Sequence, residues 1–304
     1  MLIRIGFEAT VVCPKPTPMI LALRRDPSDD RRMIGSDHIR AIPDGPIGYY
    51  TDTYGNLCAR MMMPVGATTI WSDCIVEDSG EADAFDWAAK QHEVMDLPEN
   101  TFLFLLPSRY CESDELVERA WLLFGATQPG WPRAQAIANW VHNNVLFGYP
   151  FGRPSKTATD VFREGTGVCR DFAHLFVALC RAMNIPARYV SGYLSDIGAK
   201  PDGAGDFCAW AEVYLGGRWF AFDARHNTPR IGRIPMVRGR DAADVAMITA
   251  FGNYDLSSLK VWTDPVDDTL PAPALDALLE TRPDVEALVL NAIPDRAIRG
   301  RFVP

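Results

Sequence analysis

The sequence lacks several features that mark common functional classes. No apolar run approaches the roughly 18–20 residues that a membrane-spanning helix requires. Its seven cysteines form no Cys-x-x-Cys pair and its five histidines show no metal-ligand spacing, so neither a zinc site nor a disulfide scaffold is expected. The net charge of −9 argues against non-specific binding to nucleic acids or anionic membranes. We therefore expect no metal, organic cofactor, nucleic acid or membrane as a partner.

What the chain does have is the composition of a globular protein. Its 304 residues suffice for two domains, and 48% of them are hydrophobic against 23% charged. The first residues, Met1–Glu8, alternate apolar and polar side chains, which predicts a strand rather than a signal peptide, and hence a cytoplasmic protein. Most of the scattered cysteines are expected in the core, because free thiols usually behave as small apolar residues.

The order of the predicted elements indicates an α+β protein in three parts. Residues 1–110 read as short strands broken by loops, which is typical of a β-sandwich. Residues 111–264 form the predicted core domain, and residues 265–304 a Pro- and Asp-rich extension with a weak helix near 274–279. Within the core, helices are expected near 113–124, 132–144 and 169–184, and strands near 187–194, 208–215 and 218–223.

A glycine-rich bend places a thiol at the start of the clearest helix. Cys169 follows Gly165-Thr166-Gly167-Val168 and opens a helix whose apolar residues recur at helical spacing. Unpaired N–H groups and the positive end of the helix dipole favour a thiolate there and can bind the oxyanion of a tetrahedral intermediate. Cys169 is therefore a candidate nucleophile, although its phase with Phe172 and Phe176 also suits a buried structural thiol.

A hairpin signal, Gly216-Gly217, joins two aromatic strands after this helix. In the register that a two-residue turn gives, Asp223 lies opposite Trp210 and one diagonal step from Cys208, a separation that side chains can bridge. We therefore expect Asp223 to face Cys208 and Trp210. An acid at the end of a strand can equally be a solvated strand end.

Four motifs occur together in an order that is specific to one family. They are Gly167-Val168-Cys169-Arg170-Asp171-Phe172-Ala173-His174-Leu175, Asn184-Ile185-Pro186-Ala187-Arg188-Tyr189-Val190-Ser191-Gly192-Tyr193, Ala209-Trp210-Ala211-Glu212-Val213-Tyr214 and Trp219-Phe220-Ala221-Phe222-Asp223. They resemble the bacterial transglutaminase-like family, and residues 1–110 resemble the β-rich region that precedes its core. The resemblance implies a papain-like fold, with a central helix packed on an antiparallel sheet, and a Cys–His–Asp triad for acyl transfer.

Carried over residue by residue, the triad keeps two members and lacks the third. Cys169 matches the family's nucleophile, and Asp223 matches the acid that orients the base, which predicts that both lie in one cleft with residue 208. The family's histidine stands just before Ala-Trp, where this chain has Cys208. A thiol cannot replace an imidazole there, because its neutral form is a poor base and its thiolate would repel Asp223.

Two histidines are candidate replacements for the missing base. His226 is preferred, although continued strand alternation would turn it away from Asp223 unless a turn beginning at Arg225 or His226 brings it back. His174 lies five residues after Cys169, on a different side of the helix. His174 and His142 can also be ordinary structural histidines.

Five arginines crowd the segment after the hairpin, namely Arg225, Arg230, Arg233, Arg238 and Arg240. Bidentate arginines suit carboxylate or phosphate ligands, so Arg225 is a candidate substrate contact, as is Trp210. The alternative is a set of structural ion pairs, for which Asp241 and Asp244 stand nearby.

Two functions fit these residues. The first is a thiol acyl-transfer enzyme in which Cys169 attacks a peptide or amide carbonyl and water or an amine releases the acyl group. Hydrolysis is favoured over cross-linking, because the sequence marks no amine-acceptor site. The second is a pseudoenzyme that keeps the fold to bind a peptide or another partner after losing its histidine. The residues do not indicate an oligomeric state.

Overall fold

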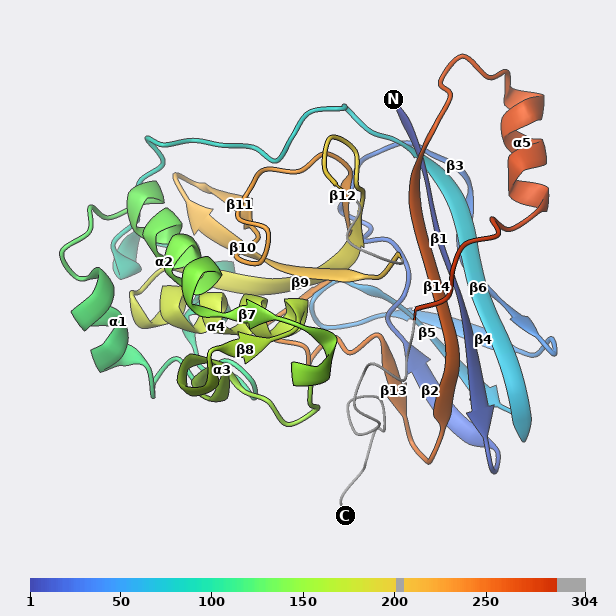
Figure 1. The fold of residues 1–304 in the computed structure, drawn as a ribbon, viewed down its shortest axis with the longest axis horizontal. Helices are drawn as coiled ribbons and strands as arrows, with labels where there is room; N and C mark the ends of the chain where they lie inside the picture. The colour runs from blue at the N-terminus through green and yellow to red at the C-terminus, as the bar shows by residue number, and fades with distance from the viewer. Residues whose placement is uncertain (201–204, 289–304) are drawn as a thin grey trace.

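The computed structural model describes residues 1–200 and 205–288. Two four-stranded antiparallel sheets form a β-sandwich, the first with the order β14-β1-β6-β3 and the second with the order β13-β2-β5-β4 (Figure 1). Their strands are β1 (Leu2–Cys13), β2 (Thr17–Leu21), β3 (Met33–Ile42), β4 (Ile47–Thr51), β5 (Leu57–Met63), β6 (Gly66–Glu77), β13 (Ile248–Ala250) and β14 (Asp255–Val266).

Alternating side chains hold the two sheets together. Ile3, Ile5 and Phe7 of β1 are fully buried and belong to the same hydrophobic core as Met19 and Leu21 of β2. A strand with one apolar face buries that face against another sheet, so the alternation read from the sequence sets the register of β1. The predicted sandwich is therefore confirmed for the strands up to β6.

The stretch that follows β6 differs from the prediction of β structure up to residue 110. Its regular elements are two 3-10 helices, η1 (Val94–Asp96) and η2 (Glu99–Leu105). The apolar residues of this stretch lack a sustained period of two, so no strand pairing follows from them. This connection carries the chain from the sandwich to the helical half (Figure 1).

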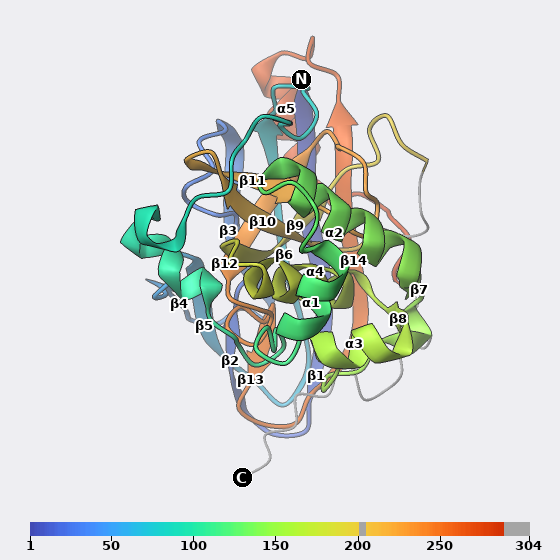
Figure 2. The same ribbon diagram turned by 90° about the vertical axis from the view of Figure 1, so that its left-hand side faces the viewer.

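The second half is a four-stranded antiparallel sheet covered by helices, as the papain-like resemblance implies (Figures 1 and 2). Its strand order is β11-β10-β9-β12. The elements are α1 (Val117–Phe124), α2 (Trp131–Asn144), β7 (Leu146–Phe147), η3 (Tyr149–Phe151), α3 (Ala158–Glu164), β8 (Thr166–Gly167), α4 (Cys169–Ala182), β9 (Ala187–Leu194), β10 (Cys208–Leu215), β11 (Arg218–Phe222) and β12 (Arg233–Gly239).

Helix α4 is the central helix of this half. Leu175, Phe176 and Leu179 are fully buried in a core that includes Ala211 and Val213 of β10. The helix ends where Asn184 adopts a φ of 59° just before Ile185-Pro186, because proline cannot continue a helix. None of the helices in the described part of the chain has the length and apolar character needed to cross a membrane.

One hydrophobic core contains residues of both halves, and the chain returns to the sandwich after the helical half. The rings of Phe7 and Phe207 lie 5.8 Å apart, which joins β1 to the segment before β10. Strand β14 returns to pair with β1, so the sandwich is built from both ends of the chain. The domain limits at residues 110 and 264 stay a prediction. The weak helix expected near 274–279 is confirmed as α5 (Ala272–Glu280), which packs near β3, whereas residues 289–304 of the predicted extension lie outside the described residues.

Candidate active site

The turn before α4 fixes the position of Cys169 as the first residue of the helix. Gly165 ends α3 with a φ of 64°, in the left-handed region that favours glycine. The Asp171 carboxylate accepts a hydrogen bond of 3.1 Å from the N–H of Val168, which ties the bend to the helix. At Gly167 a Cβ atom would lie 2.7 Å from the Cβ of Asp171, so a larger residue would displace this bond. The two glycines therefore place the thiol.

Cys169 is half-buried and packs against Cys208 and Trp210 at the start of β10. The hydrogen bond with Cys208 is the largest influence and lowers the pKa of Cys169. Burial and the charge of Asp206 act in the opposite direction, whereas Arg225 and the N–H of Ala209 lower the pKa further. The balance lies below the ordinary value, so the site favours the thiolate that a nucleophile requires.

The remaining six cysteines are buried, and each has a raised pKa. Burial is the largest cause for five of them, and it raises the pKa of Cys74 and of Cys111 to about 12. For Cys208 the largest cause is its hydrogen bond to Cys169, which leaves the proton on Cys208. The prediction that most thiols are core residues is confirmed, and Cys169 differs from all of them.

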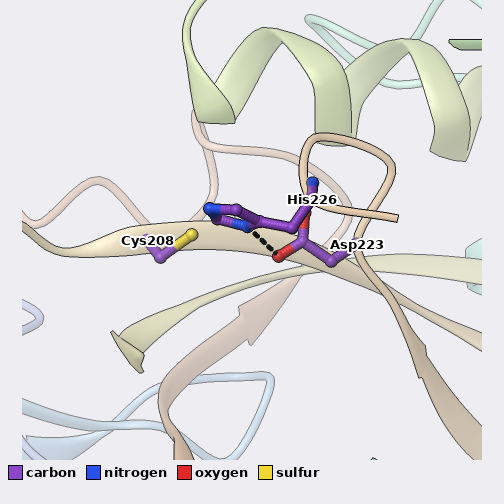
Figure 3. A group of neighbouring side chains, drawn as sticks. All are labelled: Cys208, Asp223 and His226. Carbon is purple, nitrogen blue, oxygen red and sulfur yellow. Dashed lines mark hydrogen bonds and ion pairs between the residues drawn. The ribbon is translucent and has the colours of Figure 1, made fainter. Parts of the chain in front are cut away.

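A turn directly after β11 brings His226 back to Asp223. One oxygen of the Asp223 carboxylate accepts the N–H groups of Arg225 and His226, at 3.0 and 3.2 Å, and the Asn227 N–H donates to the Asp223 carbonyl at 2.7 Å. The turn thus begins earlier than predicted, because the acid itself caps it. The other carboxylate oxygen accepts a 2.8 Å hydrogen bond from Nδ1 of His226, so this nitrogen carries the hydrogen (Figure 3).

Asp223 is also held by an arginine from β12. Both terminal nitrogens of Arg233 lie 3.3 Å from Oδ2 of Asp223, and its Nε lies 3.0 Å from Asp83. Burial alone would raise the pKa of Asp223, but the His226 hydrogen bond and the charge of Arg233 hold it well below its usual range. Asp223 is therefore a permanent carboxylate that can orient the imidazole.

Trp210, predicted as a substrate contact, packs against Arg233 and Cys208. Only 1% of the residue is exposed, and the guanidinium carbon of Arg233 lies 4.7 Å from the centre of its ring. Cys208, Trp210 and Val190 form one small apolar cluster against which Cys169 packs. Because neither cavity near the site is lined by Trp210, contact of its ring with a substrate stays a prediction.

The hairpin and the turn after β11 bring three side chains together. Cys208, Asp223 and His226 each offer a ligand atom, and these atoms lie within 4.8 Å of one another (Figure 3). Such a set could hold a metal ion by distance alone. However, Arg233 already places a positive charge on the carboxylate, and the imidazole and carboxylate bond to each other. The arrangement suits proton transfer better than binding of a cation.

A cavity of about 370 Å³ lies beside the thiol, lined by Cys169 and Cys208 together with residues of the sandwich. A second cavity of about 390 Å³ lies on the other side of Asp206 and Cys208 and is lined by Arg225 and His226. The nucleophile and the histidine thus face different spaces, and Cys208 borders both.

Comparison with known proteins identifies the helical half. Residues 123–224 match the transglutaminase-like superfamily. The chain carries a transglutaminase-like domain. A protein of Cytophaga hutchinsonii, solved as a candidate cysteine protease, is 29% identical with a TM-score of 0.77, over 89% of this chain and 92% of that one. An uncharacterized protein of Mycobacterium leprae is 25% identical over 230 residues, which cover 72% of this chain and 81% of that protein.

The range matched to the transglutaminase-like domain includes Cys169, Cys208 and Asp223 but ends before His226. The three matched residues are neighbours, since Cys169 packs against Cys208 and a side-chain atom of Cys208 lies within 4.8 Å of one of Asp223. The predicted single cleft is not what the structure has, because Cys169 and Cys208 line the cavity beside the thiol and Asp223 does not. The predicted register, with Leu215 opposite Arg218, is confirmed.

The other two histidines near the transglutaminase-like domain have structural partners. His174 is fully buried in α4, where Nε2 accepts the Ala242 N–H at 3.1 Å and the ring stacks on Tyr110. Burial holds the pKa of His174 well below its ordinary value. Nδ1 of His142 lies 2.9 Å from the carbonyl oxygen of Arg225. Neither arrangement presents an imidazole to Cys169.

Asp206 is a site residue that the sequence reading missed. It is half-buried beside the thiol and accepts a 3.1 Å hydrogen bond from the Tyr149 hydroxyl. Burial raises the pKa of Asp206 to about 6, against the lowering effects of Tyr149 and Arg225. The sequence could have indicated it, because Asp206 stands two residues before Cys208 and strand alternation puts both side chains on one face.

Crowded arginines form ion pairs, as the structural alternative predicts. The pairs include Arg230–Asp196, Arg233–Asp83 and Arg233–Asp223, Arg238–Asp26 and Arg238–Glu212, and Arg240–Asp244. The guanidinium carbon of Arg225 lies 3.6 Å from the centre of the Phe147 ring. It lines the second cavity, where contact with a substrate stays a prediction.

Proposed function

We propose that this protein is a thiol acyl-transfer enzyme, a cysteine peptidase or amidase that hydrolyses a peptide or amide bond through Cys169. The observation that carries this proposal is the position of Cys169 at the first residue of α4, packed against Cys208, whose interaction with it lowers the pKa of Cys169. The transglutaminase-like domain supports the general chemistry, and its substrate and products are our inference.

In the proposed resting state, the proton of Cys169 has moved to the imidazole through Cys208. Cys208 gives its proton to His226 and takes the proton of Cys169, which leaves a thiolate, a thiol and an imidazolium. Asp223 stabilises the imidazolium through the 2.8 Å hydrogen bond. This direction agrees with the opposite pKa shifts of the two cysteines.

The thiolate of Cys169 then attacks the carbonyl carbon, and N–H groups at the start of α4 bind the oxyanion. The C–N bond breaks as the leaving amine takes a proton from Cys208, which His226 replaces. Water releases the acyl group from the thioester: its proton passes to Cys208 as Cys208 gives its own proton to His226, its hydroxyl joins the acyl carbon, and Cys169 leaves as a thiolate. The cycle ends with one amine and one carboxylic acid.

A catalytically impaired partner-binding protein is the second candidate, because a thiol stands where the family has a histidine. The two candidates separate through labelling with iodoacetamide at pH 6, followed by mass spectrometry of each cysteine-containing peptide. We expect Cys169 to be alkylated far faster than the six thiols with raised pKa, which serve as internal controls.

Acyl transfer itself is tested with p-nitrophenyl acetate. The expected result is a burst of about one p-nitrophenol per chain, an acetyl adduct on Cys169 and continued turnover. The adduct should disappear in Cys169→Ala. A Cys169 that reacts no faster than the other thiols, and that gives no burst, would favour the pseudoenzyme. Added methylamine tests transamidation, since an N-methylamide product would contradict simple hydrolysis.

A further inference from the structure

The cavity beside Cys169 is lined by residues of the transglutaminase-like domain and by residues outside it. Its volume of about 370 Å³ lies within the range of small-molecule sites. Buried apolar residues from outside that domain line it, among them Phe7, Ala9, Leu23, Val245, Tyr254 and Leu259, each at most 9% exposed. They come from β1, β14, the segments after β2 and β12, and the residue just before β14. The sandwich and its connections therefore form a wall of the site.

The charged residues on the lining already have partners. Arg153 bonds to Glu164 at 2.7 Å, and Arg170 bonds to Asp171 at 2.8 Å. Asp206 accepts the Tyr149 hydroxyl and interacts with Arg225. A charged ligand group entering this space would lose its hydration without gaining a new ion pair, whereas an apolar group would gain from leaving water.

We propose that this cavity receives a bulky apolar group, an aromatic or branched aliphatic side chain, on the acyl side of the bond that Cys169 attacks. The inference rests on the proposed function of Cys169 as the nucleophile. The acyl group stays bonded to Cys169 in the thioester, and Cys169 itself lines the cavity. The sandwich and its connections thus take part in selecting the substrate, together with the transglutaminase-like domain that supplies the chemistry.

The test compares three alkylating reagents on the full chain: iodoacetamide, its N-hexyl derivative and a derivative of similar length that ends in a carboxylate. Rates at Cys169 are divided by the rates with free glutathione, which removes differences in intrinsic reactivity. The N-hexyl reagent should gain about fourfold for each methylene that it buries, and the carboxylate reagent should show no gain.

Two pairs of variants locate the effect. Met247→Asp places a charge on the lining, and Ala246→Trp fills the space, since both residues are half-buried and line the cavity. Their controls are Thr249→Asp and Ala243→Trp, which change exposed neighbours outside the lining. Each lining variant should abolish the N-hexyl preference, measured as the ratio of the N-hexyl rate to the iodoacetamide rate in the same variant, whereas the controls should keep that ratio.

The outcomes separate this inference from the function on which it rests. If iodoacetamide itself reacts slowly with Cys169, the proposed nucleophile fails. If iodoacetamide reacts rapidly but the N-hexyl reagent shows no preference over glutathione, only the cavity assignment is overturned. A preference that survives both lining variants would also overturn it, because the apolar group would then bind elsewhere.

Discussion

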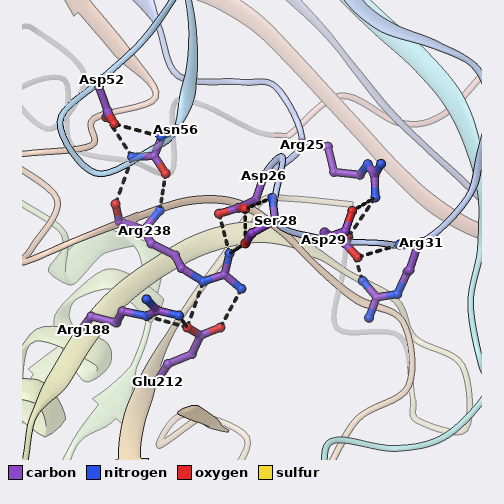
Figure 4. Close-up of polar contacts among 10 residues, drawn as sticks. All are labelled: Arg25, Asp26, Ser28, Asp29, Arg31, Asp52, Asn56, Arg188, Glu212 and Arg238. Carbon is purple, nitrogen blue, oxygen red and sulfur yellow. Dashed lines mark hydrogen bonds and ion pairs between the residues drawn. The ribbon is translucent and has the colours of Figure 1, made fainter. Parts of the chain in front are cut away.

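Two polar clusters, around Glu212 and Cys208, lie on the same face of β10. They differ in whether fixed charges already pair with one another or groups remain that can exchange a proton. Glu212 accepts hydrogen bonds from Arg188 at 2.7 Å and from Arg238 at 2.9 and 3.0 Å, and Arg238 also pairs with Asp26 (Figure 4). Around Cys208, by contrast, two thiols and an imidazole meet one permanent carboxylate. The first cluster has no proton to move, whereas the second has three groups that can exchange one.

The polar groups around Glu212 hold segments of the fold together, whereas those around Cys208 can transfer a proton. In the Glu212 cluster, Asn56 exchanges hydrogen bonds of 2.8 and 2.9 Å with the backbone of Arg238, so loops of the sandwich are fastened to β12 (Figure 4). Fixed charges in complete geometry hold two halves of the molecule together. In the Cys208 cluster, groups of opposite pKa shift stand side by side, which is the pattern expected of an acid–base site.

The largest expected effect breaks the chemical cluster. His226→Gln keeps a hydrogen-bond donor for Asp223 but cannot accept and return a proton. Turnover of p-nitrophenyl acetate should fall by about 10²–10⁴-fold, the range for loss of an acid–base group. The exposed His38→Gln is the control and should retain full turnover. Unchanged turnover in His226→Gln would show that the base lies elsewhere.

The next effect breaks the structural cluster. Glu212→Gln leaves Arg188 and Arg238 without their shared carboxylate and should lower the free energy of unfolding by about 3–5 kcal/mol, measured with urea. Glu77→Gln removes the exposed pair with Arg32 and should cost about 1 kcal/mol or less. The rate of Cys169 alkylation in the folded protein should change in neither variant. If alkylation of Cys169 slowed in folded Glu212→Gln but not in Glu77→Gln, the Glu212 cluster would not be purely structural.

A third substitution sharpens the role of the thiol at 208. Cys208→Ala removes the hydrogen bond that is the largest cause lowering the pKa of Cys169, so that pKa should rise. The pH midpoint of iodoacetamide labelling should move upward in Cys208→Ala and less in Cys208→Ser, which keeps a donor. Cys208→His restores the family pattern, and Asp223 stands ready to orient the new ring. An unchanged midpoint in Cys208→Ala would contradict the thiol pair.

The smallest effect concerns Asp206, whose negative charge raises the pKa of Cys169. Asp206→Asn removes that charge, so the labelling midpoint should move downward, opposite to Cys208→Ala. In the wild type, Asp206 ionises around its pKa of about 6, and the labelling curve should flatten as pH rises through that value. If the wild-type labelling curve showed one titration with the same midpoint as Asp206→Asn, Cys169 and Asp206 would not be coupled.

Local patterns predicted the elements that carry the transglutaminase-like domain. The apolar spacing of α4 and the two-residue turn of the hairpin fixed the register that brings Cys208 near Asp223. The return of His226 depends on a carboxylate bonding to backbone N–H groups, which competes with strand alternation and leaves no periodic signal. The prediction therefore allowed for the return of His226 to Asp223 but misplaced the start of its turn, and the role of His226 as the base stays a prediction.

Contacts between distant segments were beyond reach of the sequence pattern. The cavity wall combines β1 with residues near 245–259, and nothing in either segment signals the other. Asp206 was overlooked because its raised pKa arises from burial, which one sequence does not display. The 3-10 helices after β6 form in a stretch with irregular apolar spacing, where neither period predicts an element.

The pairing of β1 with β14 has a consequence for synthesis of the chain. Leu2 lies beside Val266, so one edge of β1 stays open until residues up to Val266 have been made. At about 5–20 residues per second, the wait after β6 is on the order of ten seconds or more. During that time an apolar strand edge is available to other nascent chains, and expression at high concentration should favour aggregation through β1.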